Sequence, residues 1–257
     1  MGFGSIVHET PDGYIRREAR SPEVRDAFAR QLQFLPWLAR ALPVAVPLPE
    51  SLLDNVLVYR RLPGEIVGPE SVAAHADSLA RDIAGFITSL HSIPIGDGIA
   101  SGMSAPNRTE ELLSCFEATL SLLSQEDQRA ARAWREGFSG LDRSSAIIHG
   151  DLWYRNLLID TDTGRLCGVL DFDNAGAGDP AWDLAAQFHL GFEFARRIFD
   201  AYPHRDADLW NRAKELFQLR QFEGLAWSAH HQDNAELEES IGKLRAAGVL
   251  PRVINPR

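Results

Sequence analysis

Three short apolar segments near the middle of the chain constrain the fold more than any other feature. The first, residues 146–148, is followed closely by Asp151; the second begins at Asn156; the third lies beyond a turn and is followed by Asp171. Apolar runs of this length bounded by turn residues are typical of buried strands. In a strand–loop–strand–turn–strand arrangement, we expect these three polar side chains to come together at one end of a hairpin.

These side chains suit one kind of chemistry. Two carboxylates and an amide oxygen are hard oxygen ligands of the type that Mg²⁺ prefers. Phosphoryl transfer requires such a set: one carboxylate to orient and deprotonate an attacking hydroxyl, and oxygen ligands for the metal that neutralises the phosphates. The three residues therefore lead to the hypothesis of a phosphoryl-transfer site.

Each motif is weak by itself, and their joint spacing is more specific. A His-Gly-Asp triplet is more often a turn than a catalytic loop, and Asp commonly ends a strand. However, the pattern His-x-Asp-Leu-x-x-x-Asn, from His149 to Asn156, has the spacing of a protein-kinase catalytic loop. An Asp-Phe pair at Asp171 follows one strand–turn–strand later, as in the kinase metal-binding segment.

The first sixty residues predict a small region rich in strands. Residues 5–8 and 14–17 form two predicted strands joined by the turn Thr10-Pro11-Asp12-Gly13. Ser-Pro-Glu, starting at Ser21, predicts the beginning of a helix, with Ser as N-cap and Pro at the first helical position. Residues 55–59 predict a buried strand, which Pro-Gly ends shortly afterwards.

Beyond residue 64 the pattern becomes mainly helical. Apolar residues recur at helical spacing in long stretches, interrupted only by the three apolar segments described above. Helices are expected over residues 73–90, 110–123, 128–138, 182–201, 206–227 and 236–247.

Composition disfavours several classes of protein. The 257 residues include 36 acidic and 26 basic side chains, a formal charge of −10, which disfavours nucleic-acid binding and favours a cationic small-molecule partner. The two cysteines cannot form a disulfide scaffold, and no Cys or His pair has zinc-site spacing. Neither a signal peptide nor a bilayer-spanning apolar tract is recognisable. We expect a cytoplasmic protein without membrane contacts, a monomer or weak dimer.

On these motifs the chain resembles the aminoglycoside phosphotransferase family of small-molecule kinases. The resemblance covers nearly the whole chain and implies an α+β, two-lobed protein-kinase-like fold. A small β-rich, nucleotide-binding N-terminal lobe would span residues 1–62, and a large, mainly helical, catalytic and substrate-binding lobe would span 63–257. The segments that carry the resemblance are IIHGDLWYRNLLID (147–160), VLDFDNAGAGDPAWDLA (169–185), LHSIP (90–94) and GFGSIVHETPDGYIRREARSPE (2–23).

The resemblance implies roles for individual residues. Asp151 would be the catalytic base, Asn156 and Asp171 would hold Mg²⁺, and His149 would support the geometry of the loop. The Gly-Asp-Pro-x-x-Asp segment has two open interpretations, because Asp before Pro is also an ordinary helix-start signal. Its acids, Asp179 and Asp183, either brace the catalytic loop or are merely structural.

The front end departs from the family pattern. Gly2, Gly4 and Ser5 can form the glycine loop that approaches the ATP phosphates. The strand that should precede this loop is missing, so we expect an N-terminal lobe truncated at its first strand. Arg17 stands where the family carries a phosphate-binding basic residue on a strand, and Gln31 stands at the helix position of its partner Glu. Because Gln cannot supply a counter-charge, weakened ATP binding is an expected consequence.

The resemblance also indicates where adenine and acceptor would bind. The hinge whose backbone would hydrogen-bond the adenine corresponds to Val58, Tyr59, Arg60 and Leu62. Carboxylates on the C-terminal helices suit a polyamine sugar, although most must be ordinary solvated positions and a Trp at helical spacing is more often core. The candidate acceptor residues are Asp173, Glu223, Trp227, His230 and His231.

The resulting functional hypothesis is ATP- and Mg²⁺-dependent transfer of the γ-phosphoryl group to a hydroxyl of a small molecule. An aminoglycoside antibiotic is the leading acceptor class, which would make the protein a resistance enzyme. Two alternatives stay open: a kinase of a macrolide, choline, homoserine or sugar amine, and a catalytically silent nucleotide-binding protein of the same fold. The intact set of Asp151, Asn156 and Asp171 favours an enzyme.

Overall fold

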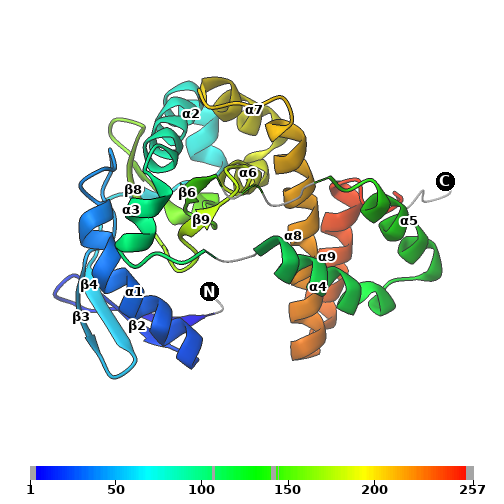
Figure 1. The fold of residues 1–257 in the computed structure, drawn as a ribbon, viewed down its shortest axis with the longest axis horizontal. Coiled ribbons are helices and arrows are strands. Elements are labelled where there is room, and N and C mark those ends of the chain that lie inside the picture. Colours follow the sequence, from blue (N-terminus) through cyan, green and yellow to red (C-terminus); the bar gives the residue numbers. More distant parts are fainter. Residues whose placement is uncertain (1–3, 106–107, 140–142, 144, 253–257) are drawn as a thin grey trace. The chain divides into compact units, whose positions relative to one another are not determined.

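The computed structural model describes residues 4–105, 108–139, 143 and 145–252 (Figure 1). The chain separates into two compact units, each built from two stretches of sequence. The first unit comprises residues 1–106 and 143–206, and the second comprises residues 107–142 and 207–257. The predicted boundary at residue 62 lies inside the first unit, so the division into lobes at that residue stays a prediction.

The first unit contains the sheets and most of the short helical turns. Its strands are β1 Ser5–Glu9, β2 Tyr14–Ala19, β3 Pro49–Leu53, β4 Val56–Arg60, β5 Glu65–Ile66, β6 Ala146–Ile148, β7 Leu157–Asp160, β8 Arg165–Val169 and β9 Gly176–Gly178. Its helices are α1 Pro22–Leu38, α2 Pro69–His91, α3 Ile95–Ala100, α6 Ala181–Ala185 and α7 Phe192–Ala201, with 3-10 turns η2 Tyr154–Asn156 and η3 Ala186–Leu190.

The front of this unit is an antiparallel sheet in the order β1-β2-β4-β3, with α1 packed against it (Figure 1). The predicted hairpin and helix start are confirmed. Gly13 has a φ of +81° in the β1–β2 turn, and the side chain of Ser21 accepts a hydrogen bond from the Val24 N–H. Phe28 of α1 is fully buried against Leu57 and Tyr59 of β4, which contributes about 2 kcal/mol.

The central apolar segments form two separate pairings. β7 and β8 make the expected hairpin, with Leu157 opposite Val169. The predicted strand over residues 146–148 lies outside this hairpin: it is β6, which pairs antiparallel with β9, with Ile147 opposite Ala177. A Cβ on Gly178 of β9 would lie 2.5 Å from Cδ1 of Ile148, so the absence of a side chain is what allows this close pairing.

The predicted helix over residues 182–201 is divided. Gly191 separates η3 from α7 with a φ of +97°, a conformation that favours glycine and that a continuous helix excludes. Helix α2 begins at Pro69, earlier than predicted. Within the described ranges, no helix combines the length and apolar character needed to cross a membrane.

The second unit is helical. Its elements are α4 Arg108–Thr119, η1 Leu120–Leu122, α5 Gln125–Glu136, α8 Leu209–His231 and α9 Asn234–Ala246. Helix α8 packs on both α4 and α9. The Phe116 and Phe222 rings meet edge-on with centroids 4.8 Å apart, and Trp134 Nε1 donates to Gln218 Oε1 at 3.0 Å.

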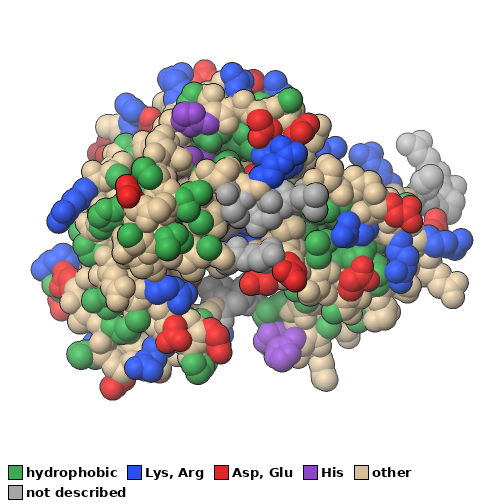
Figure 2. Space-filling model, viewed as in Figure 1, with side chains coloured by type: hydrophobic (Ala, Val, Ile, Leu, Met, Phe, Trp, Pro, Cys, Tyr) green, Lys and Arg blue, Asp and Glu red, His purple; other side chains and the backbone are tan. Residues whose placement is uncertain are grey.

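Charged side chains of both signs are interspersed over the surface drawn in Figure 2. On that face, the described residues show no continuous basic area.

Candidate active site

The β7–β8 hairpin brings two of the predicted site residues to one end. The N–H of Leu170 donates to the carbonyl of Asn156 at 2.8 Å, and Asp171 follows immediately. Asp171 has a φ of +60°, uncommon for a residue other than glycine. Asn156 donates from Nδ2 to the carbonyl of Asp151 at 2.8 Å, so its side chain also fixes the loop of residues 149–156, which is the predicted catalytic loop.

His149 connects the catalytic loop to the end of β8. Its Nε2 lies 2.8 Å from the carbonyl of Leu170, and the N–H of Asp151 donates to its Nδ1 at 3.2 Å. These partners require a proton on Nε2 and a lone pair on Nδ1. Burial lowers the pKa of His149, although nearby carboxylates oppose this shift, so the neutral ring that the geometry requires is favoured. The supporting role expected of His149 stays a prediction.

Asp183 braces the loop of residues 149–156, which is the first of the two interpretations left open for it. Its carboxylate accepts hydrogen bonds from the N–H of His149 at 2.9 Å and of Gly150 at 2.8 Å. The Nε2 of His91 lies 3.1 Å from the same carboxylate. Burial would raise the pKa of Asp183, but the His91 and backbone hydrogen bonds outweigh it and hold the pKa below its usual range.

Asp179 has a structural role away from the loop. Its Oδ1 accepts a hydrogen bond from the N–H of Ala181 at 2.9 Å, at the start of α6, and its Oδ2 accepts one from the N–H of Arg143 at 3.3 Å. Asp179 therefore fixes the chain around the start of α6, and Asp183 fixes the loop.

Sequence reasoning assigned no role to three residues that complete this support. The Nδ1 of His91 lies 2.9 Å from the hydroxyl of Tyr202, and burial raises the pKa of Tyr202, so this phenol keeps its proton. Gln187 donates to the carbonyls of Leu152 and Asp183 at 2.6 and 2.9 Å. The Leu-His-Ser-Ile-Pro helix end carried the resemblance, but the contact between His91 and Asp183 joins residues 92 positions apart.

Gly150 allows the catalytic loop to pass its neighbour. It has a φ of +76°, and a Cβ there would lie 2.5 Å from the carbonyl oxygen of Asn174. We expect Gly150→Ala to lower the free energy of unfolding by about 2 kcal/mol and to reduce kcat, because backbone strain and the contact with Asn174 both displace the loop. Urea unfolding and steady-state kinetics measure these effects.

Gly13→Ala is the matched control. Gly13 has a similar φ of +81°, but a Cβ there meets nothing within 4 Å. Both variants place an alanine at positive φ, and only Gly150→Ala also brings a Cβ against the carbonyl oxygen of Asn174. Equal losses of stability in the two variants would show that the close approach to Asn174 has no energetic effect.

Arg17 of β2 is the centre of a buried polar cluster. Its Nη1 and Nη2 donate to the two carboxylate oxygens of Asp173 at 3.0 and 2.7 Å, and Nη2 also donates to Asp171 Oδ1 at 3.3 Å. Its Nε donates to Ser5 Oγ at 3.2 Å, and the guanidinium carbon lies 4.9 Å from the centroid of the Phe28 ring. The predicted phosphate-binding cation therefore lies directly beside the predicted metal ligand.

Charges around Asp171 shape its acid–base behaviour. Burial raises the pKa of Asp171, Arg17 lowers it, and Asp173 and Asp151 raise it further; the net direction is upward. Its side chain is still 34% exposed, against 8% for Arg17, so the carboxylate remains accessible. A cation beside Asp171 would relieve the repulsion from its two acidic neighbours.

The described residues fit a magnesium ion that is held partly by phosphates. Within those residues, no group of three or more His, Cys, Asp or Glu side chains could hold a metal alone. Mg²⁺ commonly takes one or two protein oxygens and completes its octahedron with substrate phosphates and water. The Asp171 carboxylate and the Asn156 amide oxygen are donors of this type.

The remaining nucleotide-site candidates lie in or near the front sheet. Gly2 lies outside the described residues. The carbonyl of Gly4 accepts from the N–H of Arg20 at 3.1 Å, and Ser5 is the buried first residue of β1 that contacts Arg17. Ser5 therefore contacts the phosphate-binding candidate, and the role of Gly4 and Ser5 as a glycine loop stays a prediction.

The hinge candidates lie on β4 and just after it. Val58, Tyr59 and Arg60 are strand residues, and Leu62 follows in the link to β5. Tyr59 is buried, which raises its pKa to about 12, whereas Arg60 is exposed and lies over the Tyr14 ring. Recognition of adenine by this segment stays a prediction.

The acceptor candidates fall into two groups. Asp173 belongs to the first unit, where it contacts Arg17 and Gln31. The others lie on α8 of the second unit; the Trp227 and His231 rings stack at 4.2 Å, and His230 packs edge-on against His231. Glu223 is also on α8; its Oε2 lies 3.4 Å from Arg220 Nε, and its Oε1 lies 3.8 Å from Arg108 Nη2. Their roles toward an acceptor stay predictions.

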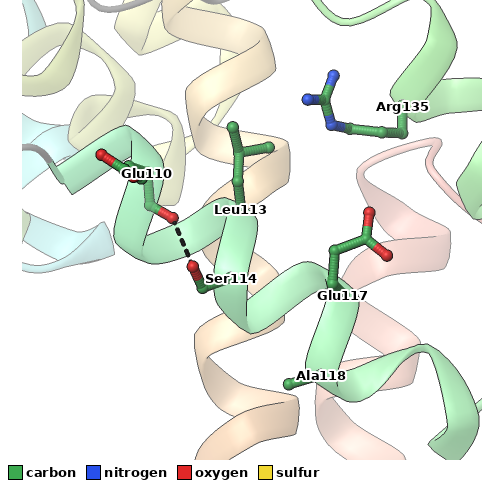
Figure 3. A pocket seen from close by; sticks show the side chains of 6 residues that line it. All are labelled: Glu110, Leu113, Ser114, Glu117, Ala118 and Arg135. Carbon is green, nitrogen blue, oxygen red and sulfur yellow. Dashed lines mark hydrogen bonds between the residues drawn. The ribbon is translucent and has the colours of Figure 1, made fainter.

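A shallow groove of about 640 Å³ lies on the second unit (Figure 3). Its walls come from α4 and α5, and Figure 3 shows Glu117 and Arg135 among its lining side chains. None of the predicted site residues lines this groove.

Comparison with known proteins gives consistent relatives. Residues 6–216 match the sequence profile described as the phosphotransferase enzyme family. Viomycin phosphotransferase of Streptomyces vinaceus is 34% identical over 140 residues, which cover 51% of this chain and 48% of that protein. Aminoglycoside 3'-phosphotransferase of Streptomyces fradiae is 26% identical over 186 residues, covering 68% of this chain and 69% of that protein. The chain thus spans about half the length of the first relative.

Solved structures share the fold. The GDP and kanamycin complex of APH(2")-IIia has a TM-score of 0.86 to this chain at 22% sequence identity, covering 96% of this chain and 91% of that one. At this identity the likeness concerns the fold alone. The predicted α+β, protein-kinase-like fold is confirmed.

Proposed function

The chain belongs to the phosphotransferase enzyme family, and from this premise we propose that it is an ATP-dependent kinase of a small-molecule alcohol. It transfers the γ-phosphoryl group to a hydroxyl of a cationic acceptor in the cytoplasm. Aminoglycoside antibiotics are the leading acceptor class, and their phosphorylation would make this chain a resistance enzyme.

One observation supports this proposal above the others. At one end of the β7–β8 hairpin, the N–H of Leu170 donates to the carbonyl of Asn156, and Asp171 is the next residue after Leu170. Arg17 Nη2 lies 3.3 Å from Asp171 Oδ1. Two oxygen donors and a guanidinium beside each other suit a metal-bound polyphosphate. A catalytically silent protein has no physical need for this arrangement.

The chain's own residues account for the steps. Asn156 and Asp171 would hold Mg²⁺, which when bound neutralises phosphate charge. Arg17 would bind phosphate oxygens, and its planar fork suits them. Asp151 would orient the acceptor hydroxyl and take its proton as the oxygen bonds to the γ-phosphorus and the bond to the bridging oxygen breaks. The hydrogen bonds that the N–H groups of His149 and Gly150 donate to Asp183 would keep Asp151 in place for this step.

The acceptor class follows from charge and from the relatives' names. The chain carries a formal charge of −10, which favours a cationic acceptor. Two relatives are named for viomycin and aminoglycoside acceptors. A cationic antibiotic is therefore the first acceptor to test.

A substrate panel tests the proposal. The purified chain is incubated with Mg²⁺ and ATP or GTP against aminoglycosides, viomycin, a macrolide, choline and homoserine, and products are weighed by mass spectrometry. We expect a gain of one phosphoryl group on an aminoglycoside with ATP. Phosphorylation of another compound would reassign the acceptor, and thermal stabilisation by nucleotide without any product would favour the silent protein.

A further inference from the structure

Arg17 of β2 has a carboxylate partner that comes from outside α1, namely Asp173. In the family pattern, a helix Glu holds the strand cation, and this chain has Gln31 at that position. We propose that Asp173 supplies the counter-charge in its place, orienting Arg17 for the nucleotide phosphates, while Gln31 fixes Asp173. This inference rests on the proposed function, because it assigns Arg17 to a bound nucleotide. It also assigns Asp173 to positioning, in place of the acceptor contact expected from sequence.

The contact between Arg17 and Asp173 has the geometry of a strong pair. Nη1 meets Oδ1 at 3.0 Å and Nη2 meets Oδ2 at 2.7 Å, so both carboxylate oxygens bond in parallel to the guanidinium. Such bidentate pairs fix orientation as well as distance. The contact with Asp171 is single and longer, at 3.3 Å. Asp173 is thus the principal partner, and Asp171 keeps an oxygen for a metal.

Gln31 has the chemistry that this arrangement needs. Its Nε2 donates to Asp173 Oδ1 at 2.6 Å, to the same oxygen that accepts from Arg17 Nη1. Gln31 is 2% exposed. A glutamate there would place a second carboxylate against the partly buried Asp173, and two carboxylates in contact repel each other. The amide at position 31 and the carboxylate at position 173 are therefore complementary, and the departure from the family pattern is paired.

The other contacts of Arg17 leave it little freedom. Ser5 Oγ accepts from Nε at 3.2 Å, and the Phe28 ring lies beneath the guanidinium. Four of its five N–H donors thereby meet partners within the described residues. Removal of the Asp173 charge would release the end of the side chain that the phosphates are expected to meet, while the sheet position of Arg17 stays the same.

A double-mutant cycle tests the proposal directly. Asp173→Asn removes the carboxylate, Gln31→Glu adds one to α1, and the double variant moves the charge from the loop to the helix without changing the net charge. ADP and ATP affinity with Mg²⁺ are measured by calorimetry, and the melting temperature is measured without nucleotide. We expect each single variant to bind nucleotide at least about tenfold more weakly and the double variant to recover most of the loss.

Asp162→Asn is the matched control, since it makes the same chemical change at an exposed position in the β7–β8 turn. It should bind nucleotide like the wild type. The inference is overturned if Asp173→Asn keeps wild-type nucleotide affinity, if it raises only the KM for the acceptor, or if the losses of the two single variants simply add. If the cycle shows recovery but no acceptor is phosphorylated, the inference stands and the proposed reaction fails. If the wild type binds no nucleotide, both fail.

Discussion

Replacing Asp151 by Asn will lower kcat by about a thousandfold or more, while the Kd for nucleotide stays within about threefold of the wild-type value. Asparagine has the shape of aspartate but cannot take the proton of the acceptor hydroxyl. The backbone N–H and carbonyl of Asp151, which the substitution keeps, make contacts with His149 and Asn156 that hold the loop. The fold should therefore survive, and only the proposed chemical step should be lost.

Single-turnover kinetics and calorimetry measure the two quantities separately, with Asp162→Asn as the control for an Asp-to-Asn change elsewhere. Turnover near the wild-type level would remove Asp151 from the role of base. A parallel loss of nucleotide affinity would instead indicate that the carboxylate mainly shapes the site.

Replacing Asp183 by Asn should destabilise the fold by about 3 kcal/mol, because a buried carboxylate with several partners is exchanged for a group that cannot accept from all of them. Asp183 is fully buried and lies within hydrogen-bond distance of His149, Gly150 and His91. The amide nitrogen of Asn would face an N–H donor. We also expect a loss of kcat, because the catalytic loop loses its support. Urea unfolding gives the first quantity and steady-state kinetics gives the second.

The effect of Asp183→Asn should depend on pH in one direction. The folded-state pKa of Asp183 lies below the unfolded value of about 3.9, so its ionised form stabilises the folded chain at pH values above that. This contribution is lost as pH falls through the lower, folded-state pKa. The difference in unfolding free energy between wild type and variant should be constant from about pH 5 to 8 and shrink below about pH 4.

Asp200→Asn provides the comparison for this variant. Asp200 is 51% exposed and pairs with Arg196 one helical turn away, a type of surface pair that contributes at most about 0.5 kcal/mol. If Asp183→Asn cost no more than Asp200→Asn, the hydrogen bonds to the catalytic loop would have no role in stability.

Local sequence signals predicted much of the fold. The β1–β2 turn needs Gly13 at positive φ, and the start of α1 needs a Ser cap followed by Pro; both requirements concern neighbouring residues. The hairpin that aligns Asn156 with the residue before Asp171 is equally local, since a short turn sets its register. These features could therefore be recognised from the sequence alone.

The elements that were not predicted depend on partners from other parts of the chain. β9 has the sequence Gly-Ala-Gly, which carries no side-chain pattern, and it forms a strand only because β6 lies beside it. β3 begins at Pro49, where no strand was predicted, and it pairs as the outer neighbour of β4. Gly191 ended a helix whose apolar pattern continued through it.

The site shows the same division. Motif spacing was enough to select Arg17 and Asp171 as candidate site residues. The pairing of Arg17 with Asp173 joins residues 156 positions apart, and no spacing rule connects them. Sequence reasoning treated Gln31 as a loss of charge, because the carboxylate that compensates for it comes from a different part of the chain.

The second unit has a consequence for how its properties could be transferred. It is assembled from residues 107–142 and 207–257, and its interior joins the two stretches through the rings of Phe116 and Phe222 and the bond from Trp134 to Gln218. A chimera that takes one stretch from a relative would leave half of these partners mismatched. Recombination that swaps a single contiguous block therefore cannot graft this module intact, and two coordinated exchanges are needed.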